Sequence, residues 1–448
     1  MNMLNHTWRF HGGIHFDDKK RFSNAKAAKN APLLQRYVLP LRQSIGAGSK
    51  LLVAKGDKVL KGQKIAEHDG FVSIPLHAPT SGTIGELREI PSANGSYIPA
   101  IEILSDGLDQ WCDLPPCWEN WSEIEEKDLK QRIWNSGIAG MGGAAFPTHV
   151  KLTPPLEKAI DTLIVNGGEC EPYLTSDHRL MLECAEKVLC GAAIAAKILK
   201  VNRILLGVES NKMDAVKELG KHVAKYQVRI VPLPKKYPQG GEKQLIRSLT
   251  GRQIISGGLP MDVGCVVQNV GTCAAICDAV TLARPMIERY VTVSGEAVAE
   301  PQTWIMRIGT PIQDALRISG GLKENVREVL TGGPMMGFAQ NNLDGSVLKS
   351  TSGLLFLPKS VIGRDYESSP CIHCGRCVNV CPMRLQPGLL SLMIENQDYE
   401  AAAQTNVTDC IECGSCAYVC PARRPLVQFF RRAKQEIKMK RDYKNIAK

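Results

Sequence analysis

Eight of the sixteen cysteines lie between Cys371 and Cys420, in two copies of one spacing. The first copy is Cys371-x2-Cys374-x2-Cys377-x3-Cys381-Pro382, and the second is Cys410-x2-Cys413-x2-Cys416-x3-Cys420-Pro421. Three thiolates separated by two residues each can wrap one face of an iron–sulfur cubane, while the fourth points away from it. The proline ends any helix that the cysteines begin. The spacing therefore predicts two [4Fe–4S] clusters.

This repeat resembles the bacterial two-cluster ferredoxins, in which the fourth cysteine of each motif ligates the other cluster. The resemblance implies that one cluster is held by Cys371, Cys374, Cys377 and Cys420, and the other by Cys410, Cys413, Cys416 and Cys381. The alternative is two structural zinc ions, each bound by four thiolates. Zinc sites usually pair two knuckles across a longer loop and need no four-cysteine run ending in proline, so the spacing favours iron–sulfur clusters.

A glycine-rich loop between residues 137 and 151 is suited to binding phosphate. Backbone N–H groups of such a loop can approach a phosphate closely, and Lys151 at its end adds a positive charge. Glycine runs are more often simple tight turns, so this loop alone is a weak signal.

Three further polar elements follow this loop. A predicted buried strand at Thr162–Val165 ends in Asn166, and Glu169 and Glu171 come directly after it. Glu242 lies in a second glycine-rich segment and Asn269 in a third, 268–272. Open α/β sheets bind ligands at the carboxyl ends of their strands, so these residues are candidates for one site.

These four elements, in this order, resemble the NADH- and FMN-binding flavoprotein subunit of respiratory complex I. The resemblance implies that Gly140, Gly142, Gly143 and Lys151 line the nucleotide and flavin phosphates. It also implies that Asn166, Glu169 and Glu171 face the flavin and nicotinamide, the two glutamates as catalytic residues, with Glu242 and Asn269 closing the site. Three positions depart from that family's pattern: Met141 replaces an arginine, Gly168 an aspartate and Gly271 a glutamate. The lost charges imply weaker retention of the flavin.

The whole chain resembles the RnfC family of the Rnf (Rsx) electron transport complex. The early His11-Gly12-Gly13-Ile14-His15 segment fits that family. The resemblance implies a translocase and oxidoreductase subunit that takes part in NADH and ferredoxin electron transfer coupled to ion transport. Its expected cofactors are two [4Fe–4S] clusters, FMN and NAD(H). Its expected place is the cytoplasmic face of the inner membrane, as a peripheral protein beside other subunits of the complex, with ferredoxin as a further candidate partner.

The pattern along the chain predicts a multidomain α/β and α+β protein. Short glycine-punctuated strands in the first hundred residues resemble a barrel-sandwich hybrid, without the lysine that carries a prosthetic group in biotinyl domains. Strands alternating with helices then predict a parallel sheet, and short strands return after Glu288. The predicted domains are a barrel-sandwich hybrid at 1–115, an α/β NADH/FMN-binding domain at 116–285, a β-grasp (SLBB-like) module at 286–340, a linker at 341–367, a ferredoxin-type domain at 368–424 and a basic amphipathic helix at 425–448.

Composition excludes several classes of protein. The chain has 448 residues, 44% hydrophobic and 22% charged, which is ordinary globular composition. No apolar run is long enough to predict a transmembrane segment, and residues 1–16 contain no apolar signal-peptide core, so export is not expected. Clustered cysteines in such a long chain argue against a secreted disulfide scaffold.

The C-terminal tail carries most of the net charge of +10. Residues 423–448 contain ten Lys and Arg against Glu436 and Asp442, a net +8. Leu426, Phe429, Phe430, Ala433 and Ile437 form a helical stripe. Such a helix can lie on anionic lipid, dock an acidic partner or simply pack on the ferredoxin-type domain. Nucleic acid is not expected as a partner, because no binding motif appears.

Two other functions remain open from the sequence. One is a soluble NADH dehydrogenase or diaphorase-type flavin iron–sulfur subunit that works without a membrane. The other is an electron-wiring protein whose α/β domain binds no nucleotide.

Overall fold

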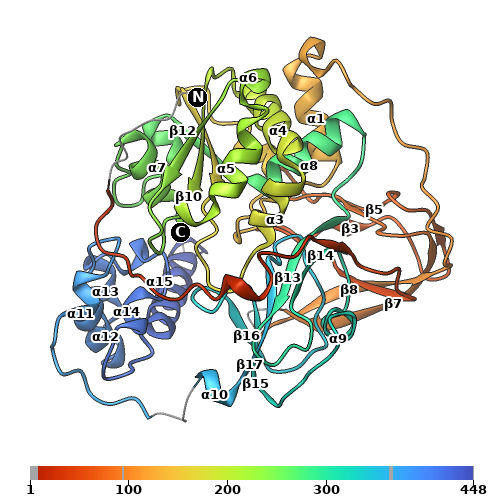
Figure 1. Ribbon diagram of the computed structural model, residues 1–448. Helices are drawn as coiled ribbons and strands as arrows, with labels where there is room; N and C mark the ends of the chain where they lie inside the picture. Colours follow the sequence, from red (N-terminus) through yellow and green to blue (C-terminus); the bar gives the residue numbers. More distant parts are fainter. Residues whose placement is uncertain (1–8, 93–94, 363–366, 447–448) are drawn as a thin grey trace.

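The computed structural model describes residues 9–92, 95–362 and 367–446 (Figure 1). Four units follow one another along the chain and pack against each other. Their strands form four sheets: two in the N-terminal unit, one parallel sheet in the second and one mixed sheet in the third. None of the helices in the described part of the chain combines the length and hydropathy that crossing a bilayer requires.

The N-terminal unit consists of two small antiparallel sheets around one apolar core. Tyr37, Ile65 and Ile103 lie at its centre and are almost fully buried. The strand order is β2-β8-β7-β4 in one sheet and β3-β5-β6 in the other. The strands are β2 Arg36–Pro40, β3 Lys50–Leu51, β4 Lys58–Val59, β5 Lys64–Glu67, β6 Leu76–His77, β7 Gly82–Pro91 and β8 Tyr97–Ser105.

The second unit is a parallel four-stranded sheet in the order β11-β10-β9-β12. Its strands are runs of Val, Ile and Leu, as expected of strands that are buried on both faces. Helices α4 and α8 cover one face and α7 the other. The elements are α1 Glu126–Asn135, α2 Thr148–Lys151, β9 Thr162–Gly167, α3 Ser176–Glu183, α4 Ala185–Leu199, β10 Arg203–Glu209, α5 Met213–Gly220, α6 Val223–Tyr226, β11 Val228–Leu233, α7 Glu242–Thr250, β12 Cys265–Asn269 and α8 Val270–Thr281.

The third unit is a six-stranded mixed sheet with helix α9 packed on it. The strand order is β1-β14-β13-β17-β15-β16, so β1 from the N-terminal segment forms one edge. The elements are β1 Lys29–Asn30, β13 Glu288–Ser294, β14 Gln302–Arg307, α9 Ile312–Ile318, β15 Val326–Thr331, β16 Phe338–Gln340, β17 Gly353–Pro358 and α10 Lys359–Ile362.

Strand β17 lies inside the segment 341–367, for which the sequence predicts a linker. It pairs in parallel with β13 and antiparallel with β15, and all six of its residues are buried. Four consecutive apolar residues, Leu354 to Leu357, suit a central strand with both faces covered. The third unit therefore extends to Pro358, beyond the predicted end at 340.

A second difference concerns residues 181–198, whose pattern predicts a single helix. The structure has two helices there, α3 and α4, because the backbone at Cys184 leaves the helical region with φ −129° and ψ 34°. The strands that the sequence predicts at 203–208 and 228–231 correspond to β10 and β11.

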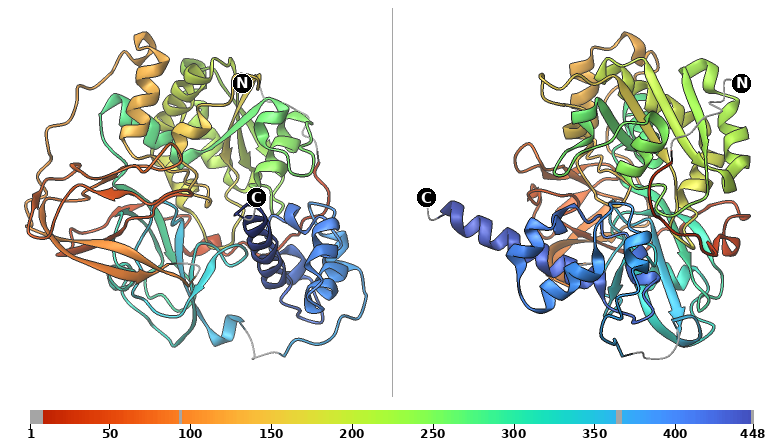
Figure 2. Two further views of the ribbon diagram at one scale, coloured as in Figure 1. Left: turned by 180° about the vertical axis from the view of Figure 1, so that it is seen from behind. Right: turned by 90° about the vertical axis from the view of Figure 1, so that its left-hand side faces the viewer.

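The fourth unit is made of short helices and the two cysteine motifs. Its core contains Leu390, Ile394 and Val407 together with Phe430 of the last helix. The helices are α11 Arg376–Asn379, α12 Pro387–Glu395, α13 Tyr399–Gln404, α14 Ser415–Tyr418 and α15 Leu426–Ile446. The far part of α15 projects away from the body of the protein (Figure 2, right).

Candidate functional site: two cysteine cavities and the edge of the parallel sheet

The first cysteine motif lines a cavity of about 220 Å³ in the fourth unit. Cys371, Cys374 and Cys377 line it, and the fourth cysteine in its wall is Cys420 from the second motif. A Cβ on Gly388 would lie 3.6 Å from Cys377 Sγ, so the absence of a side chain lets α12 approach the sulfurs. These four cysteines are the crossed set that the resemblance to the two-cluster ferredoxins implies. The cavity between them suits a cubane better than a single zinc ion, which would draw four sulfurs to about 2.3 Å from one centre, and no such single-ion group occurs among the described residues.

The second motif is more deeply buried. Cys381, Cys413 and Cys416 are buried and Cys410 is half-buried. Burial raises the pKa of the Cys410 thiol to about 11. Burial, followed by the charges of Cys410, Cys413 and Cys381, also raises the pKa of the Cys416 thiol. The four cysteines of the second motif thus gather in one largely buried region of the fourth unit.

At the carboxyl edge of the parallel sheet, Asn166 joins two loops. Its Nδ2 donates to the Gly240 carbonyl oxygen at 2.9 Å, and its Oδ1 accepts from the Gly168 N–H at 3.0 Å. A Cβ on Gly240 would lie 1.9 Å from the Gly168 oxygen, so the loops touch through their backbones. A larger residue at position 168 would crowd this contact, which explains the departure from aspartate there.

The glycine-rich loop lies beside the start of α8. Gly142 and Gly143 are exposed, and Gly143 has φ +105° with no atom within 4 Å of an added Cβ. Asn269 caps α8 by accepting from the Gly271 N–H at 2.8 Å. Exposed backbone N–H groups next to the N-terminus of a twelve-residue helix fit a phosphate.

The three other predicted residues of this region already have partners. Gly140 donates its N–H to the Phe146 carbonyl oxygen at 2.8 Å. Lys151 Nζ lies 2.9 Å from Glu242 Oε1 and donates to the Val267 carbonyl oxygen at 3.1 Å. Lys151 and Glu242 therefore form one ion pair beside the glycine-rich loop, partly open to solvent.

The other two departures from the complex I pattern lie in contact with each other. A Cβ on Gly271 would stand 2.9 Å from the Met141 sulfur. The arginine and the glutamate of the pattern would thus occupy neighbouring positions. Their joint replacement by methionine and glycine removes two opposite charges and leaves no unpaired charge behind.

Glu169 is surrounded by donors from the protein. It accepts from Ser176 Oγ at 3.0 Å and from the N–H groups of Asp177 and His178 at 2.9 and 3.3 Å, at the start of α3. Lys20 Nζ lies 3.8 Å from its other side. Burial opposes ionisation of Glu169, but Lys20 and Lys212 hold its pKa below the ordinary value. These contacts favour a positioning role over the predicted catalytic one.

Glu171 connects the sheet edge to the β-grasp unit and to the second cysteine motif. Its carboxylate accepts from the N–H groups of Met335 and Met336 at 3.0 and 2.9 Å. The Tyr237 hydroxyl lies 3.5 Å from Glu171 Oε1 and donates to the Cys413 carbonyl oxygen at 2.7 Å. Burial raises the pKa of Glu171 to about 7, against the two N–H groups, which lower it.

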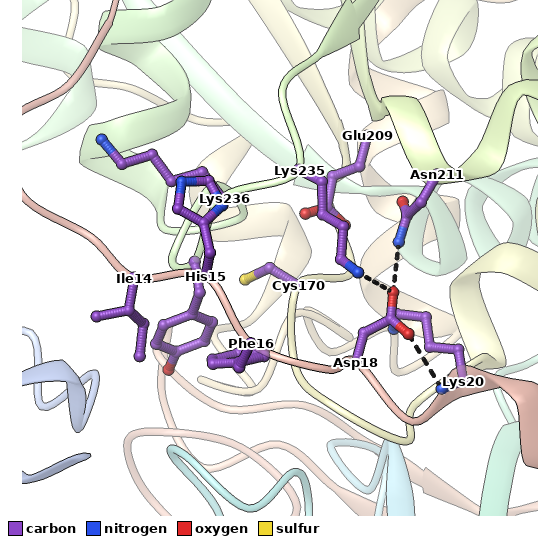
Figure 3. Close-up of a pocket in the computed structure, with 11 residues that line it drawn as sticks. Ile14, His15, Phe16, Asp18, Lys20, Cys170, Glu209, Asn211, Lys235 and Lys236 are labelled. Carbon is purple, nitrogen blue, oxygen red and sulfur yellow. Dashed lines mark hydrogen bonds and ion pairs between the residues drawn. The ribbon is translucent and has the colours of Figure 1, made fainter. Parts of the chain in front are cut away.

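A cavity of about 120 Å³ lies beyond the ends of β9, β10 and β11 (Figure 3). Cys170 lines it from the sheet side, and the segment 14–18 covers it. Asp18 closes one side by pairing with Lys235 at 2.8 Å and accepting from Asn211 at 3.0 Å. The cavity is smaller than the roughly 300–1,000 Å³ of ordinary ligand pockets. The N-terminal segment thus fills this part of the edge, while Gly142 and Gly143 of the glycine-rich loop are exposed.

Three residues that support the site do not emerge from the sequence alone. Lys20 is buried and donates to the carbonyl oxygens of Glu171 and Leu174. Lys212 pairs with Glu209 at 2.6 Å and donates to the Glu169 carbonyl oxygen at 3.2 Å. Tyr237 makes the bridge to Cys413 described above. Lys20 lies about 150 residues from its partners in the sequence, so no local sequence pattern could indicate these contacts.

Four known domain families match the chain in the predicted order. The RnfC barrel sandwich hybrid domain matches residues 8–108, and the Nuo51 FMN-binding domain matches 133–278. The SLBB domain matches 290–339, and the 4Fe-4S dicluster domain matches 364–421. The predicted fold class is confirmed by these matches.

Relatives with similar sequences extend over nearly the whole chain. The C component of the proton-translocating ferredoxin:NAD(+) oxidoreductase complex of Clostridium ljungdahlii is 49% identical, over 95% of this chain and 93% of the relative. The C component of the Na(+)-translocating ferredoxin:NAD(+) oxidoreductase complex of Acetobacterium woodii is 43% identical, over 96% of this chain and 97% of the relative. The C component of the ion-translocating oxidoreductase complex of Pseudomonas aeruginosa is 45% identical over 96% of this chain, which spans 56% of that longer relative.

Among solved structures, a chain of an NAD+-reducing [NiFe]-hydrogenase in the H2-reduced state is similar in fold. The TM-score is 0.50 and the identity 18%, over 71% of this chain and 64% of the other.

Proposed function

This chain belongs to the RnfC family, the C components of ion-translocating ferredoxin:NAD(+) oxidoreductase complexes, and from this membership we propose that it transfers electrons between NAD(H) and the iron–sulfur centres of such a complex. In this role it is a translocase and oxidoreductase subunit with an FMN-binding domain and two [4Fe–4S] clusters. Family membership favours this function over a diaphorase-type subunit that works without a membrane.

One contact carries the proposal: the Tyr237 hydroxyl bonds the Cys413 carbonyl oxygen at 2.7 Å. Tyr237 follows β11 of the α/β unit, and Cys413 belongs to the second motif. The edge of the sheet that is suited to a nucleotide therefore touches the cluster site of Cys410, Cys413, Cys416 and Cys381. Electrons that pass between the nucleotide site and this cluster would therefore travel through the Tyr237–Cys413 contact, within one chain.

Each part has a distinct chemical task. NADH gives up two electrons as hydride while a cubane accepts one at a time, and FMN supplies the conversion between them when bound. We assign the phosphate contacts to the exposed N–H groups of Gly142 and Gly143, with the charge of Lys151 beside them, while Gly140 holds the loop through its hydrogen bond to Phe146. Asn166, Glu242 and Asn269 hold the loops around the flavin and nicotinamide, Glu169 positions its loop, and Glu171 stands between this site and the second motif.

The test is anaerobic reconstitution of the full chain with iron, sulfide and FMN, followed by titration with NADH. We expect about eight irons per chain, a flavin absorbance band and reduction of both clusters by NADH in electron paramagnetic resonance spectra. Clusters that assemble but are never reduced by NADH, with no flavin bound, would instead support the wiring protein.

We further propose a peripheral position at the cytoplasmic face of the inner membrane. The tail helix supports this only in part. Leu426, Phe430 and Ala433 are buried in the core of the fourth unit, and Phe429 and Ile437 pack against it. The apolar stripe is therefore not free to enter lipid. Truncation after Pro425 would therefore open this core.

The exposed cations of the tail give a cleaner test. Arg431 and Lys434 pair with Glu412, each at 2.8 Å, whereas Arg432, Lys438 and Arg441 are exposed. Each basic residue near an anionic leaflet contributes about 1 kcal/mol, screened over about 8 Å at physiological salt. Replacing the last three by glutamine should release the chain from membranes at lower salt while iron content stays unchanged. Equal retention over a salt series would assign docking to another surface.

A further inference from the structure

The two cysteine motifs adopt the same local structure in very different surroundings. His373 and Glu412, two residues after the first cysteine of each motif, both have φ +56°. Gly375 and Gly414 have φ +72° and +76°, and each precedes a four-residue helix, α11 or α14. The fourth unit therefore has two equivalent faces, one at each cluster site.

The face at the second motif is covered by the rest of the chain. A Cβ on Gly414 would lie 2.8 Å from the Met335 oxygen of the β-grasp unit, and Tyr237 bonds Cys413. Ile411 packs with Ile14 and Tyr237. On this side the chain's own domains occupy the position through which electrons enter or leave the cluster.

The equivalent face at the first motif is open. We call it the open cluster face and define it by Ile372, His373, Cys374, Arg376, Val378 and Leu389, all exposed. Ile372 is 64% exposed, whereas its equivalent, Ile411, is half-buried. An added Cβ on Gly375 would meet no atom within 4 Å, in contrast to Gly414.

The open cluster face combines apolar and basic side chains around the exposed Cys374. Ile372, Val378 and Leu389 provide the apolar part. Arg376 pairs with no carboxylate among the described residues, and no aspartate or glutamate is among the residues that line the cavity. At the covered face the position of His373 is taken by Glu412, which pairs with Arg431 and Lys434 of α15. The cation of the open face, Arg376, has no such carboxylate partner among the described residues, so this face suits an acidic partner.

Resting on the function proposed above, we propose that the open cluster face docks an acidic region of another subunit of the complex that carries its own one-electron redox centre. A one-electron centre is required because the cluster behind this face exchanges single electrons, and the other cluster lies toward the chain's own nucleotide domain. The apolar residues exclude water at the contact, while Arg376 sets the charge of the partner.

Amide hydrogen exchange tests the surface without any substitution. Amides of residues 372–378 should exchange at least tenfold more slowly in the assembled complex than in the isolated full chain with both clusters loaded. Equal exchange in the two states would overturn the proposal. Protection of the same amides by vesicles of anionic phospholipid alone would also overturn it, because the occupant would then be a lipid surface.

Variants in the assembled complex test the contact itself. Arg376→Glu and Ile372→Glu should lower electron transfer from reduced ferredoxin to NAD+ at least tenfold at low salt. Leu156→Glu, which places the same negative charge at a fully exposed leucine of the α/β unit, should leave it unchanged. NADH-driven cluster reduction in each chain is measured in parallel. Its absence in the unmodified chain would contradict the proposed function, whereas full turnover by both glutamate variants would contradict the docking alone.

Discussion

Replacing Cys381 with alanine should remove the cluster held by Cys410, Cys413 and Cys416 and leave the cluster beside Cys371 intact. Cys381 lies close enough to Cys416 to act on its thiol electrostatically together with Cys410 and Cys413, whereas the cavity of the first motif takes Cys420 as its fourth cysteine. Iron content should fall from about eight to about four per chain, because each cubane holds four irons. Electron paramagnetic resonance of the dithionite-reduced chain identifies the remaining cluster.

The same variant should uncouple the nucleotide site from the remaining cluster. The lost cluster is the one whose ligand Cys413 is bonded by Tyr237 of the α/β unit. NADH should then still reduce an artificial dye through the flavin but no longer reduce the cluster beside Cys371. Cys117→Ala, at an exposed cysteine outside both motifs, is the control. Loss of the Cys371-side signal alone would overturn the crossed assignment.

Local patterns were sufficient for the first strand of the parallel sheet and for the iron–sulfur domain. Thr162–Val165 lies within β9, because an uninterrupted run of β-branched residues and leucine suits a strand that is buried on both faces. The predicted two-cluster domain coincides with the match to the 4Fe-4S dicluster domain at 364–421. Its cysteine spacing is a direct consequence of cubane geometry.

Contacts between distant parts of the chain could not be predicted in this way. Periodicity identified the apolar stripe of α15 but not its partner, and Phe430 lies in the core of the fourth unit. The segment 341–367, for which the sequence predicts a linker, contains β17, and the neighbours of β17 in the sheet, β13 and β15, lie elsewhere in the chain. The contact of Met141 with Gly271 likewise explains two departures from a family pattern that look independent in the sequence.

Glu169 and Glu171 occupy nearby loop positions in the sequence, and the structure predicts different consequences when each is replaced by glutamine. Glu169→Gln removes a buried negative charge from the vicinity of Lys20 and Lys212 and weakens three hydrogen bonds to the start of α3. Breaking a buried ion pair by removing one partner costs about 3–5 kcal/mol. The variant should therefore unfold at a markedly lower temperature at pH 7 and lose NADH oxidation together with the loop. An unchanged melting temperature would refute this positioning role.

Glu171→Gln should instead change how stability depends on pH. The folded-state pKa of about 7 lies above the ordinary value of 4.5. Between these values the folded chain holds a proton that the unfolded chain releases, so the contribution of Glu171 is full below pH 4.5 and is lost as pH rises through 7. This contribution is at most about 3 kcal/mol.

Asp177, whose pKa is raised to about 7 by burial and by Glu169, acts in the same direction, so the variant should flatten only part of the dependence of stability on pH. Melting temperatures at about pH 5, 6, 7 and 8 measure this change. Glu157→Gln, at an exposed position, should leave the profile as it is, and an identical profile for Glu171→Gln would mean that this carboxyl titrates normally.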